Sequence, residues 1–405
     1  MIGFALQCQV KVPGMMSAMF SRRTGWKLTV NRFTQAQREL AESGREMLDL
    51  TVSNPTRVGL AYDTETILKS LSSPAVLDYD PQPRGLRNAR EAVAAYYSED
   101  HASSVGPESI ILTTSTSEGY SYIFRLLCNH DDEVLVPKPS YPLFEFLADL
   151  QDVKLVPYPL VYDHGWQVDF HSLSKAVTQR TRAVVIVHPN NPTGSYISSA
   201  ERIALNDFCR ANNLALIVDE VFLDYAHDGA HRPSFVTNQD VLTFTLSGLS
   251  KISALPQMKL GWSVTSGPKD EVNAAMERLE IIADTYLSVS TPTQVAAGVL
   301  LDARKKLQPL LCDRVRQNLA QLDLQLGRNK SCCRLEIEGG WYAVVRMPAT
   351  QSDEDLAIRL IRTKSVLVHP GHFYDFTDDG FLVLSLITAP DVSREGVRCI
   401  LEGIE

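Results

Sequence analysis

One lysine lies in surroundings that favour chemistry over simple solvation. Lys251 follows the apolar, β-branched stretch 241–245, and the run 246–251 that leads to it reads Leu-Ser-Gly-Leu-Ser-Lys. A lysine at the end of a buried strand has a lowered pKa, and its neutral amine forms a Schiff base with an aldehyde. A lone lysine is usually a solvated surface charge, but small and apolar neighbours disfavour that interpretation here.

A carboxylate ends a second apolar stretch. Asp219 follows residues 214–218, and Glu220 comes directly after it. A carboxylate at the end of a buried strand costs desolvation free energy unless it meets a positive group. That group is either the protonated ring nitrogen of a bound cofactor or a partner in a structural ion pair, and helix capping is a further alternative.

Hydroxyl side chains gather where a third apolar stretch leads into a helix. Residues 113–118 read Thr-Thr-Ser-Thr-Ser-Glu and connect the stretch 109–112 to a helical pattern over 118–128. Backbone N–H groups at a helix start, together with hydroxyls, form a phosphate site. Capping of the helix by Ser117 is the other interpretation.

Two further turns carry polar or aromatic side chains. Residues 189–194 read Pro-Asn-Asn-Pro-Thr-Gly after the stretch 183–187, and Asn191 offers both a donor and an acceptor. Tyr141, in a Pro-Ser-Tyr-Pro run after the stretch 133–136, either stacks on a planar ring or packs in the core.

The elements that must position these residues follow from the alternating pattern. Short β-branched stretches separated by helical ones predict an α/β fold, a mostly parallel sheet flanked by helices, with ligands at the carboxyl ends of the strands. A helical region from residue 291 to about 326, then strands at 335–347 and 381–386, predict a smaller α+β domain. We expect a disordered or mis-assigned start at 1–19, a segment at 20–60 joining the small domain, a large domain at 61–295 and the small domain at 296–405.

Composition excludes several classes of function. The 405 residues carry a net charge of −9, which argues against nucleic-acid binding, and no apolar run approaches the ~18 residues of a membrane span. The seven cysteines show no Cys-x-x-Cys pair and no histidine at metal spacing. We therefore expect no metal, and reduced thiols in a cytoplasmic protein.

The motifs occur in one order along the chain, and together they resemble the class I/II aminotransferases. These are pyridoxal 5'-phosphate (PLP) enzymes of the aspartate aminotransferase fold, fold type I, and the match extends from about Asp49 to the C-terminus. The resemblance implies that Lys251 holds PLP as a Schiff base and moves protons, and that Asp219 pairs with the pyridinium nitrogen. It also implies that Asn191 bonds the ring's phenolic oxygen and that Tyr141 stacks on the ring.

The remaining implied roles concern the phosphate, the partner subunit and the substrate. The phosphate is expected to bind to Ser115, Thr116, Ser117 and Ser250. Tyr79 corresponds to a tyrosine that reaches the phosphate from a partner subunit, which implies a homodimer. Asn54 lies in an N-terminal loop that approaches the substrate.

Three positions depart from the family's pattern. Lys259 stands where the family has an arginine, so the charge is kept and the bidentate fork is lost. Phe222 replaces a tyrosine whose hydroxyl stabilises the deprotonated imine, so we expect a protonated imine at neutral pH unless Tyr225 compensates. Val383 replaces the arginine that binds the substrate α-carboxylate.

The valine leaves the binding of the substrate open. Either the substrate lacks an α-carboxylate at that point, or another arginine reaches it. Arg57 is the best candidate, although it is equally a solvated loop residue, and Arg22 and Arg23 are further candidates from the N-terminal segment. We expect weak turnover of ordinary α-amino acids such as aspartate.

Three functions fit a PLP site. The leading one is an aminotransferase that moves an amino group between an amino acid or amine and a keto acid. The second uses the same cofactor for elimination, replacement, cyclisation or oxidation. The third, a PLP-binding sensor that regulates transcription, is disfavoured by the acidic charge and by the absence of a DNA-binding module before Asp49.

Overall fold

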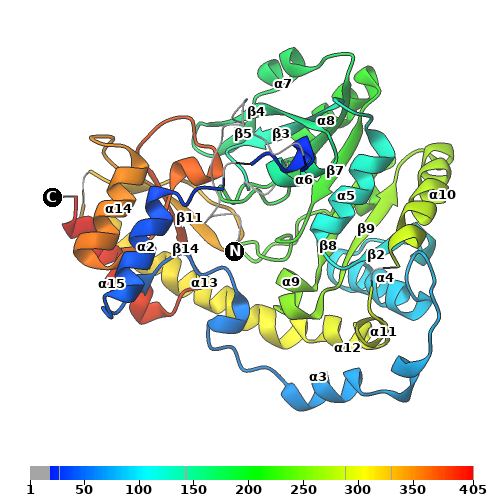
Figure 1. Ribbon diagram of the computed structural model, residues 1–405, viewed down its shortest axis with the longest axis horizontal. Helices are drawn as coiled ribbons and strands as arrows, with labels where there is room; N and C mark the ends of the chain where they lie inside the picture. The colour runs from blue at the N-terminus through cyan, green and yellow to red at the C-terminus, as the bar shows by residue number, and fades with distance from the viewer. Residues whose placement is uncertain (1–18, 27, 142–143, 288, 330, 405) are drawn as a thin grey trace.

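A computed structural model describes residues 19–26, 28–141, 144–287, 289–329 and 331–404. Figure 1 shows a larger part built on an extended sheet between helices and, to its left, a smaller part that holds the C-terminus. Apart from Met19, the expected irregular start at 1–19 lies outside the described residues. Within those residues, no helix is both long and apolar enough to cross a membrane.

The larger part is organised around an eight-stranded sheet of order β2-β9-β8-β7-β6-β3-β4-β5. Its strands are β2 (Ile110–Thr113), β3 (Glu133–Lys138), β4 (Lys154–Tyr162), β5 (Trp166–Val168), β6 (Thr181–Val187), β7 (Ala215–Asp219), β8 (Thr243–Gly248) and β9 (Gly261–Ser266). Neighbours from β8 through β7, β6 and β3 to β4 are parallel, whereas β9 is antiparallel to β2 and β8, and β5 is antiparallel to β4. The predicted α/β fold with a mostly parallel sheet is confirmed; β4, β5 and β9 are additional strands.

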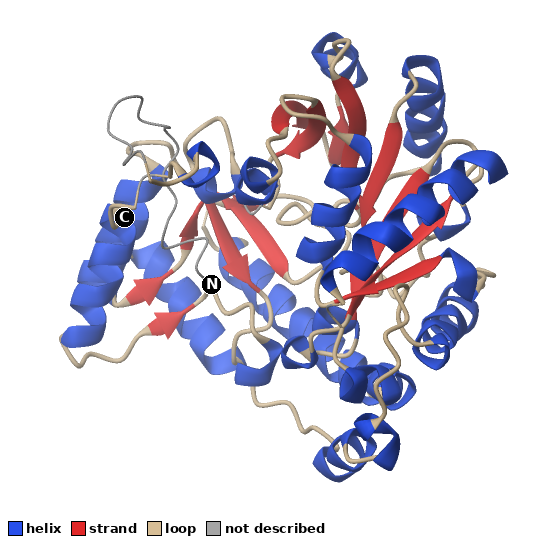
Figure 2. Ribbon diagram, turned by 45° about the vertical axis from the view of Figure 1, so that its right-hand side comes forward, coloured by secondary structure: helices blue, strands red, loops and turns tan. Residues whose placement is uncertain are grey.

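Helices cover both faces of this sheet (Figure 2). One face packs against α5 (Thr116–Leu127), α6 (Phe144–Leu150) and α10 (Lys269–Tyr286), and the other against α4 (Arg87–His101), α7 (Phe170–Ala176), α8 (Ser199–Asn212) and α12 (Ala297–Asp302). On β7, Ile217 belongs to the first core, whereas Leu216 and Val218 belong to the second. Because strand side chains alternate between faces, the continuous apolar stretch serves both cores.

The strand directions gather the predicted site at one edge. Strands β2, β3, β6, β7 and β8 run the same way, so their carboxyl ends meet there. The antiparallel strand β9 begins at this edge, directly after the loop that carries Lys259. Every motif singled out between residues 113 and 259 therefore follows a strand end, or precedes a strand start, on the same side of the sheet.

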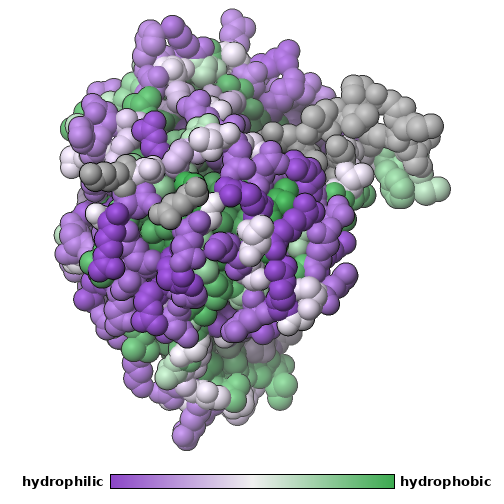
Figure 3. Space-filling model, turned by 90° about the vertical axis from the view of Figure 1, so that its left-hand side faces the viewer, coloured by the Kyte–Doolittle hydropathy of each residue, from purple (hydrophilic) through white to green (hydrophobic). Residues whose placement is uncertain are grey.

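The smaller part combines a four-stranded sheet with helices on its outer side. It contains α2 (Arg32–Glu42), β1 (Leu48–Asp49), α13 (Arg304–Leu326), β10 (Cys333–Arg334), β11 (Tyr342–Arg346), α14 (Asp353–Lys364), β12 (Val366–Leu367), β13 (His369–Pro370), β14 (Phe381–Ser385) and α15 (Pro390–Glu402). The N-terminal segment belongs here by contact, because β1 pairs in parallel with β12 and α2 packs on α14. The outer face on this side is mainly hydrophilic with small apolar patches (Figure 3).

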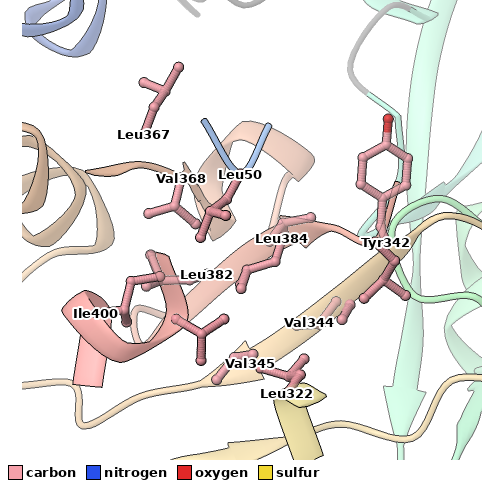
Figure 4. Packing of buried hydrophobic residues seen from close by; sticks show 14 of the residues in the cluster. Leu50, Leu322, Tyr342, Val344, Val345, Leu367, Val368, Leu382, Leu384 and Ile400 are labelled. Carbon is pink, nitrogen blue, oxygen red and sulfur yellow. The ribbon is translucent and has the colours of Figure 1, made fainter. Parts of the chain in front are cut away.

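One face of the small sheet is the main core of this part. Leu382 and Leu384 of β14 pack with Leu50, Leu322 and Ile400, whereas the Tyr342 ring points away from them (Figure 4). Strand neighbours point to opposite faces, so Val383 lies on the Tyr342 face.

Two expectations about this part of the chain need correction. The helical region after residue 291 is divided into α11 (Thr291–Val295), α12 and α13. The strand expected at 335–347 is shorter, because Gly339 and Gly340 form a turn with Gly340 at φ +84°, and β11 begins only at Tyr342. The remaining helices are α3 (Thr64–Leu71) and α9 (Leu249–Ile252), with short 3-10 turns η1 (Arg22–Thr24), η2 (Pro55–Arg57), η3 (Pro74–Leu77), η4 (Pro107–Ser109), η5 (Phe235–Thr237), η6 (Pro256–Met258) and η7 (Gly371–Tyr374).

Candidate active site

Lys251 lies in α9, one turn beyond β8, with its amine against two aromatic rings. Its Nζ is 4.9 Å from the centroid of the Trp341 ring and 5.3 Å from that of Phe222. Burial lowers the pKa of Lys251 to about 8, and the charge of Asp219 partly opposes this shift. The neutral, nucleophilic form of the amine is therefore far better populated near neutral pH than in an exposed lysine.

Asp219 is the last residue of β7, the strand next to β8. The Tyr120 hydroxyl donates to its Oδ2 at 3.3 Å, and the Val221 N–H donates to its Oδ1 at 3.1 Å. Burial raises the pKa of Asp219 to about 6. Both of these hydrogen-bond donors are neutral, so a cationic group brought beside the buried carboxylate would stabilise it.

The hydroxyl-rich loop after β2 caps α5 and closely approaches β9. The cap is Ser115 and not Ser117: the Ser115 Oγ accepts the Glu118 N–H at 3.3 Å. A Cβ added to Gly261 would lie 3.0 Å from the Ser115 carbonyl carbon and 3.1 Å from the Thr116 nitrogen. The glycine thus lets β9 pass directly behind a half-buried helix start, where N–H groups attract an anion.

Ser250 and Lys259, the other residues expected near the phosphate, lie in the segment that connects β8 to β9. Ser250 is half-buried and occupies α9 beside Lys251. Lys259 is exposed and has a left-handed backbone, φ +54°, two residues before Gly261. Both stand at the carboxyl edge of the sheet, where a positive charge and a hydroxyl suit a phosphate.

The turn with Asn191 is fastened to the loop with Tyr141. The Ser140 Oγ donates to Asn190 Oδ1 at 3.2 Å, and the Asn190 amide donates to Pro139 O at 3.0 Å. Asn191 itself is buried, and its Oδ1 has no hydrogen-bond partner within the described part of the chain. Tyr141 is 38 % exposed, which is high for an aromatic ring at a strand end and leaves it free to stack on a ligand.

Phe222 and Tyr225 both face the lysine, but in different ways. The Phe222 ring contacts the amine, as described above. The Tyr225 hydroxyl donates to the backbone carbonyl of Lys251 at 2.7 Å. The suggestion that Tyr225 replaces the missing tyrosine hydroxyl is therefore wrong, because its proton is already used to hold the lysine's backbone.

Val383 is buried in β14, opposite Val344 on one side and His369 on the other. Arg57 is exposed in η2, which Asn54 caps: the Asn54 Oδ1 accepts the Thr56 N–H at 3.0 Å. Val383 therefore offers no charge to a carboxylate, and the exposure of Arg57 fits both of the roles considered for it.

Arg23 does not fit its suggested role. Its Nε donates to Asp152 at 2.6 Å, and Asp152 precedes β4 at the amino edge of the sheet, away from the strand ends of the site. Arg22 is exposed beside it in η1. Tyr79 is 77 % exposed and borders a hollow that Tyr122 and Gln294 also line.

Sequence reasoning missed the aromatic wall that the smaller part brings to the lysine. Trp341 and Tyr342 follow the Gly-Gly turn, and Tyr374 packs on Tyr342 with ring centroids 6.4 Å apart. The Gly-Gly-Trp-Tyr run was the available signal, since two glycines before two aromatics indicate a close backbone approach. Among the described residues, no group of three or more histidine, cysteine, aspartate or glutamate side chains could hold a metal ion.

A half-buried lysine and a buried carboxylate on adjacent strand ends, beside a helix start suited to phosphate, are groups that an enzyme needs to react with a phosphorylated carbonyl compound. Residues 45–397 match the family "Aminotransferase class I and II", and the chain belongs to this family. It is an aminotransferase, which moves an amino group between an amino acid or amine and a keto acid. This finding favours transamination over the other outcomes considered for the same cofactor.

Several named proteins are similar to the chain. Glutamate-pyruvate aminotransferase AlaA of Haemophilus influenzae is 29% identical over 86% of this chain and 88% of its own. Alanine aminotransferase of Mycobacterium tuberculosis is 27% identical over 87% and 83%. Among solved structures, Pyrococcus furiosus alanine aminotransferase superposes with a TM-score of 0.84 at 21% identity, covering 91% of this chain and 95% of its own. The aspartate aminotransferase fold is also found in a Thermus thermophilus aspartate aminotransferase mutant, with a TM-score of 0.82, 22% identity and coverage of 96% and 100%.

The close approach of Gly261 to the helix start yields a first prediction. Gly261→Ala forces the Ser115–Thr116 backbone to move, and overpacking of this kind costs about 1–3 kcal/mol. We expect the dissociation constant for PLP, measured by equilibrium dialysis of the apoenzyme, to rise at least about tenfold. Gly106→Ala is the matched control, because a Cβ there meets open space. Equal PLP affinity in the two variants would contradict the assignment of the loop.

Proposed function

We propose that the chain binds PLP at the carboxyl edge of the large sheet and attaches it covalently through the amine of Lys251. The observation that carries this proposal is the pairing, on adjacent strands, of a partly buried lysine of lowered pKa with the buried carboxylate of Asp219. The cofactor, when bound, supplies an electron sink for the substrate carbon that loses a proton. The residues of the chain bind, orient and exchange protons.

Three side chains fit the cofactor ring. Asp219 pairs with the ring nitrogen and, through this cation, remains ionised despite its burial. Asn191 orients the ring oxygen with its amide, and the unpartnered Oδ1 beside that amide supports a polar ligand there. Tyr141 stacks on the ring with its exposed face.

The phosphate binds at the start of α5. The donors are the N–H groups of that helix start, the hydroxyls of Ser115, Thr116, Ser117 and Ser250, and the ammonium group of Lys259. The close passage of Gly261 behind Ser115 supports this placement, because it fixes the helix start without filling the space in front of it. A lysine gives charge without a bidentate fork, so Lys259 contributes attraction more than orientation.

Lys251 also moves the proton of the reaction. A base that accepts a proton and later returns it works best with a pKa near the operating pH, and burial brings this amine close to that range. The Tyr225 hydroxyl holds the backbone of Lys251, so the side chain can move while its main chain stays in place.

The substrates are an amino acid or amine and a keto acid. Arg57 binds the substrate carboxylate, the role that an arginine at the position of Val383 has in the family. The relatives are named for glutamate, pyruvate and alanine, which supports an amino acid and a keto acid as the two substrate classes, and the valine at 383 leads us to expect weak turnover of alanine itself. Arg57 supports this role by its exposure and by its place in the loop beyond Asn54, since the Ser53 side chain of that loop bonds Tyr342 of the aromatic wall.

We further propose a homodimer in the cytoplasm, built from two-domain subunits divided near residues 61 and 296. Exposed apolar side chains around Tyr79 support the dimer: Leu77 is 87 % exposed, and Leu287 lines the same hollow as Tyr79. Tyr79 then reaches the phosphate of the other subunit. Six described cysteines are free thiols, which supports a reducing compartment.

Lys251→Ala tests the covalent anchor. We expect purified wild-type protein to be yellow and to keep the cofactor after borohydride treatment, as shown by peptide mass spectrometry at Lys251, because the reduced linkage is stable. The variant should lose this linkage. Lys259→Ala is the control, since it should weaken PLP affinity yet keep the linkage. Wild-type activity in Lys251→Ala would overturn the proposed function.

Arg57→Ala tests the carboxylate site. A charged hydrogen bond contributes about 1.5–3 kcal/mol, so kcat/KM for the best amino-acid substrate should fall about ten- to hundredfold. Arg22→Ala, which removes another exposed arginine, should leave it unchanged, and aspartate and alanine should be weak substrates of the wild type. Efficient turnover of alanine, undiminished in Arg57→Ala, would contradict both the proposed site and the significance of Val383.

Leu77→Asp tests the dimer. A charge in an apolar interface should dissociate the subunits and raise the dissociation constant for PLP, because Tyr79 of the partner subunit is removed with them. Light scattering and PLP titration measure the two effects. Ile203→Asp, at an exposed apolar position on α8, should change neither. A wild-type monomer with full PLP affinity would exclude the arrangement.

A further inference from the structure

The amino group of Lys251 lies over aromatic faces contributed by both parts of the molecule. Trp341 comes from the small part and Phe222 from the loop after β7, and their rings meet edge to face with centroids 5.1 Å apart. The amine is within 5.3 Å of both centroids. Distances below about 6 Å are those at which an ammonium group is attracted by an aromatic quadrupole.

Trp341 is fixed in this position by its backbone and its neighbours. The Gly340 N–H donates to the Tyr225 carbonyl at 2.9 Å, and the Leu386 N–H donates to the Trp341 carbonyl at 2.7 Å. The Tyr225 ring packs edge to face on the indole, with centroids 5.1 Å apart. The same Tyr225 holds the lysine backbone through its hydroxyl, so one residue sets the spacing between ring and lysine.

Packing alone does not explain an indole at this position. Trp341 is fully buried, and its Nε1 has no hydrogen-bond partner within the described part of the chain. A buried N–H without an acceptor costs free energy, and a phenylalanine or leucine would fill much of the space without that cost. The indole has, however, the strongest π face for a cation among the side chains.

The charge near the amine does not by itself offset the effect of burial on its ammonium form. Asp219 of β7 is the charge that acts on Lys251, and it favours the ammonium form. Burial acts in the opposite direction and is the larger effect. Phe222 is neutral, and the Tyr225 hydroxyl is bonded to the lysine's carbonyl. The faces of the Trp341 and Phe222 rings therefore supply additional stabilisation of the ammonium group.

We propose that Trp341 is a positioning residue for Lys251: its indole face, with that of Phe222, receives the amino group whenever it is not bonded to the cofactor and stabilises its ammonium form against burial. The inference rests on the proposed role of Lys251 as cofactor lysine. It gives the released amine a defined resting place. It also prevents the pKa of the amine from falling far below the pH at which the enzyme works.

The test is the titration of Lys251 in the apoenzyme, which needs no cofactor chemistry. Acetylation by trace acetic anhydride across a pH series, read at Lys251 by peptide mass spectrometry, yields its pKa, and exposed Lys259 is the internal reference. Removing a cation–π contact should lower the pKa of Lys251 by about 0.4–1.5 in Trp341→Leu. Trp341→Phe keeps a weaker face, so its shift should have the same sign and be smaller.

Trp262→Phe is the matched control. Trp262 is equally buried, but it packs in the core between β9 and α4, where its Nε1 donates to the Tyr97 hydroxyl at 3.0 Å. We expect an unchanged Lys251 pKa in this variant. A shift as large as in Trp341→Phe would mean general loosening and would overturn the proposal, as would an unchanged pKa in both Trp341 variants.

A folding defect and a failure of the proposed function can each be distinguished from a failure of this inference. Should Trp341→Leu fail to fold, as judged by circular dichroism, Trp341→Phe and Phe222→Leu decide, and both must lower the Lys251 pKa. Loss of the proposed function would show in another measurement, the covalent linkage at Lys251, and would leave the titration as it is.

Discussion

Two opposite charges held on neighbouring strand ends in a low-dielectric interior are the interaction on which the site depends. Asp219 ends β7 and Lys251 follows β8, and burial shifts both pKa values toward the neutral forms. The attraction within such a pair repays the cost of removing both charges from water only where its geometry is fixed. The two strands lie inside the sheet, with packed helices on both faces, and this location supplies the fixed surroundings.

The second constraint is the joint between the two parts of the molecule. In the loop after Asp219, the Asp224 carboxylate accepts hydrogen bonds from the Tyr96 hydroxyl of α4 at 2.9 Å and from the Gln308 amide of α13 at 2.5 Å. On the other side of the joint, the Glu338 carboxylate accepts the Tyr196 N–H at 2.9 Å. These bonds connect the loop after β7 and the turn before Trp341 to both parts of the molecule, and they help to hold Trp341 beside the lysine.

The sequence indicated the site better than it indicated the surroundings. Side chains at strand ends carry local signals, such as the hydroxyl run before α5, and strand direction then brings them together. Strand β9 was missed because its run Gly-Trp-Ser-Val-Thr-Ser mixes polar and apolar residues. Its burial comes from tertiary packing, with α4 on one face of the sheet and α5 and α10 on the other. The roles of Trp341 and Tyr225 were equally out of reach, since they arise from tertiary contacts with Lys251, which lies 90 positions from Trp341 and 26 from Tyr225.

If the face of β14 that carries Val383 binds substrate, as the resemblance implies, the valine changes the substrate site without a change of fold. Val383 shares its sheet face with Tyr342 and His369, the face opposite the packed core of Leu382 and Leu384. A neutral side chain here cannot form the buried, bidentate hydrogen bonds that an arginine makes with a carboxylate. It leaves a surface of aromatic and aliphatic side chains instead. In the proposed arrangement the carboxylate is bound by exposed Arg57, where it would be solvated and the interaction screened by salt. Recognition then depends more on the apolar portion of the substrate, whose burial against the wall is insensitive to salt, than on its charge.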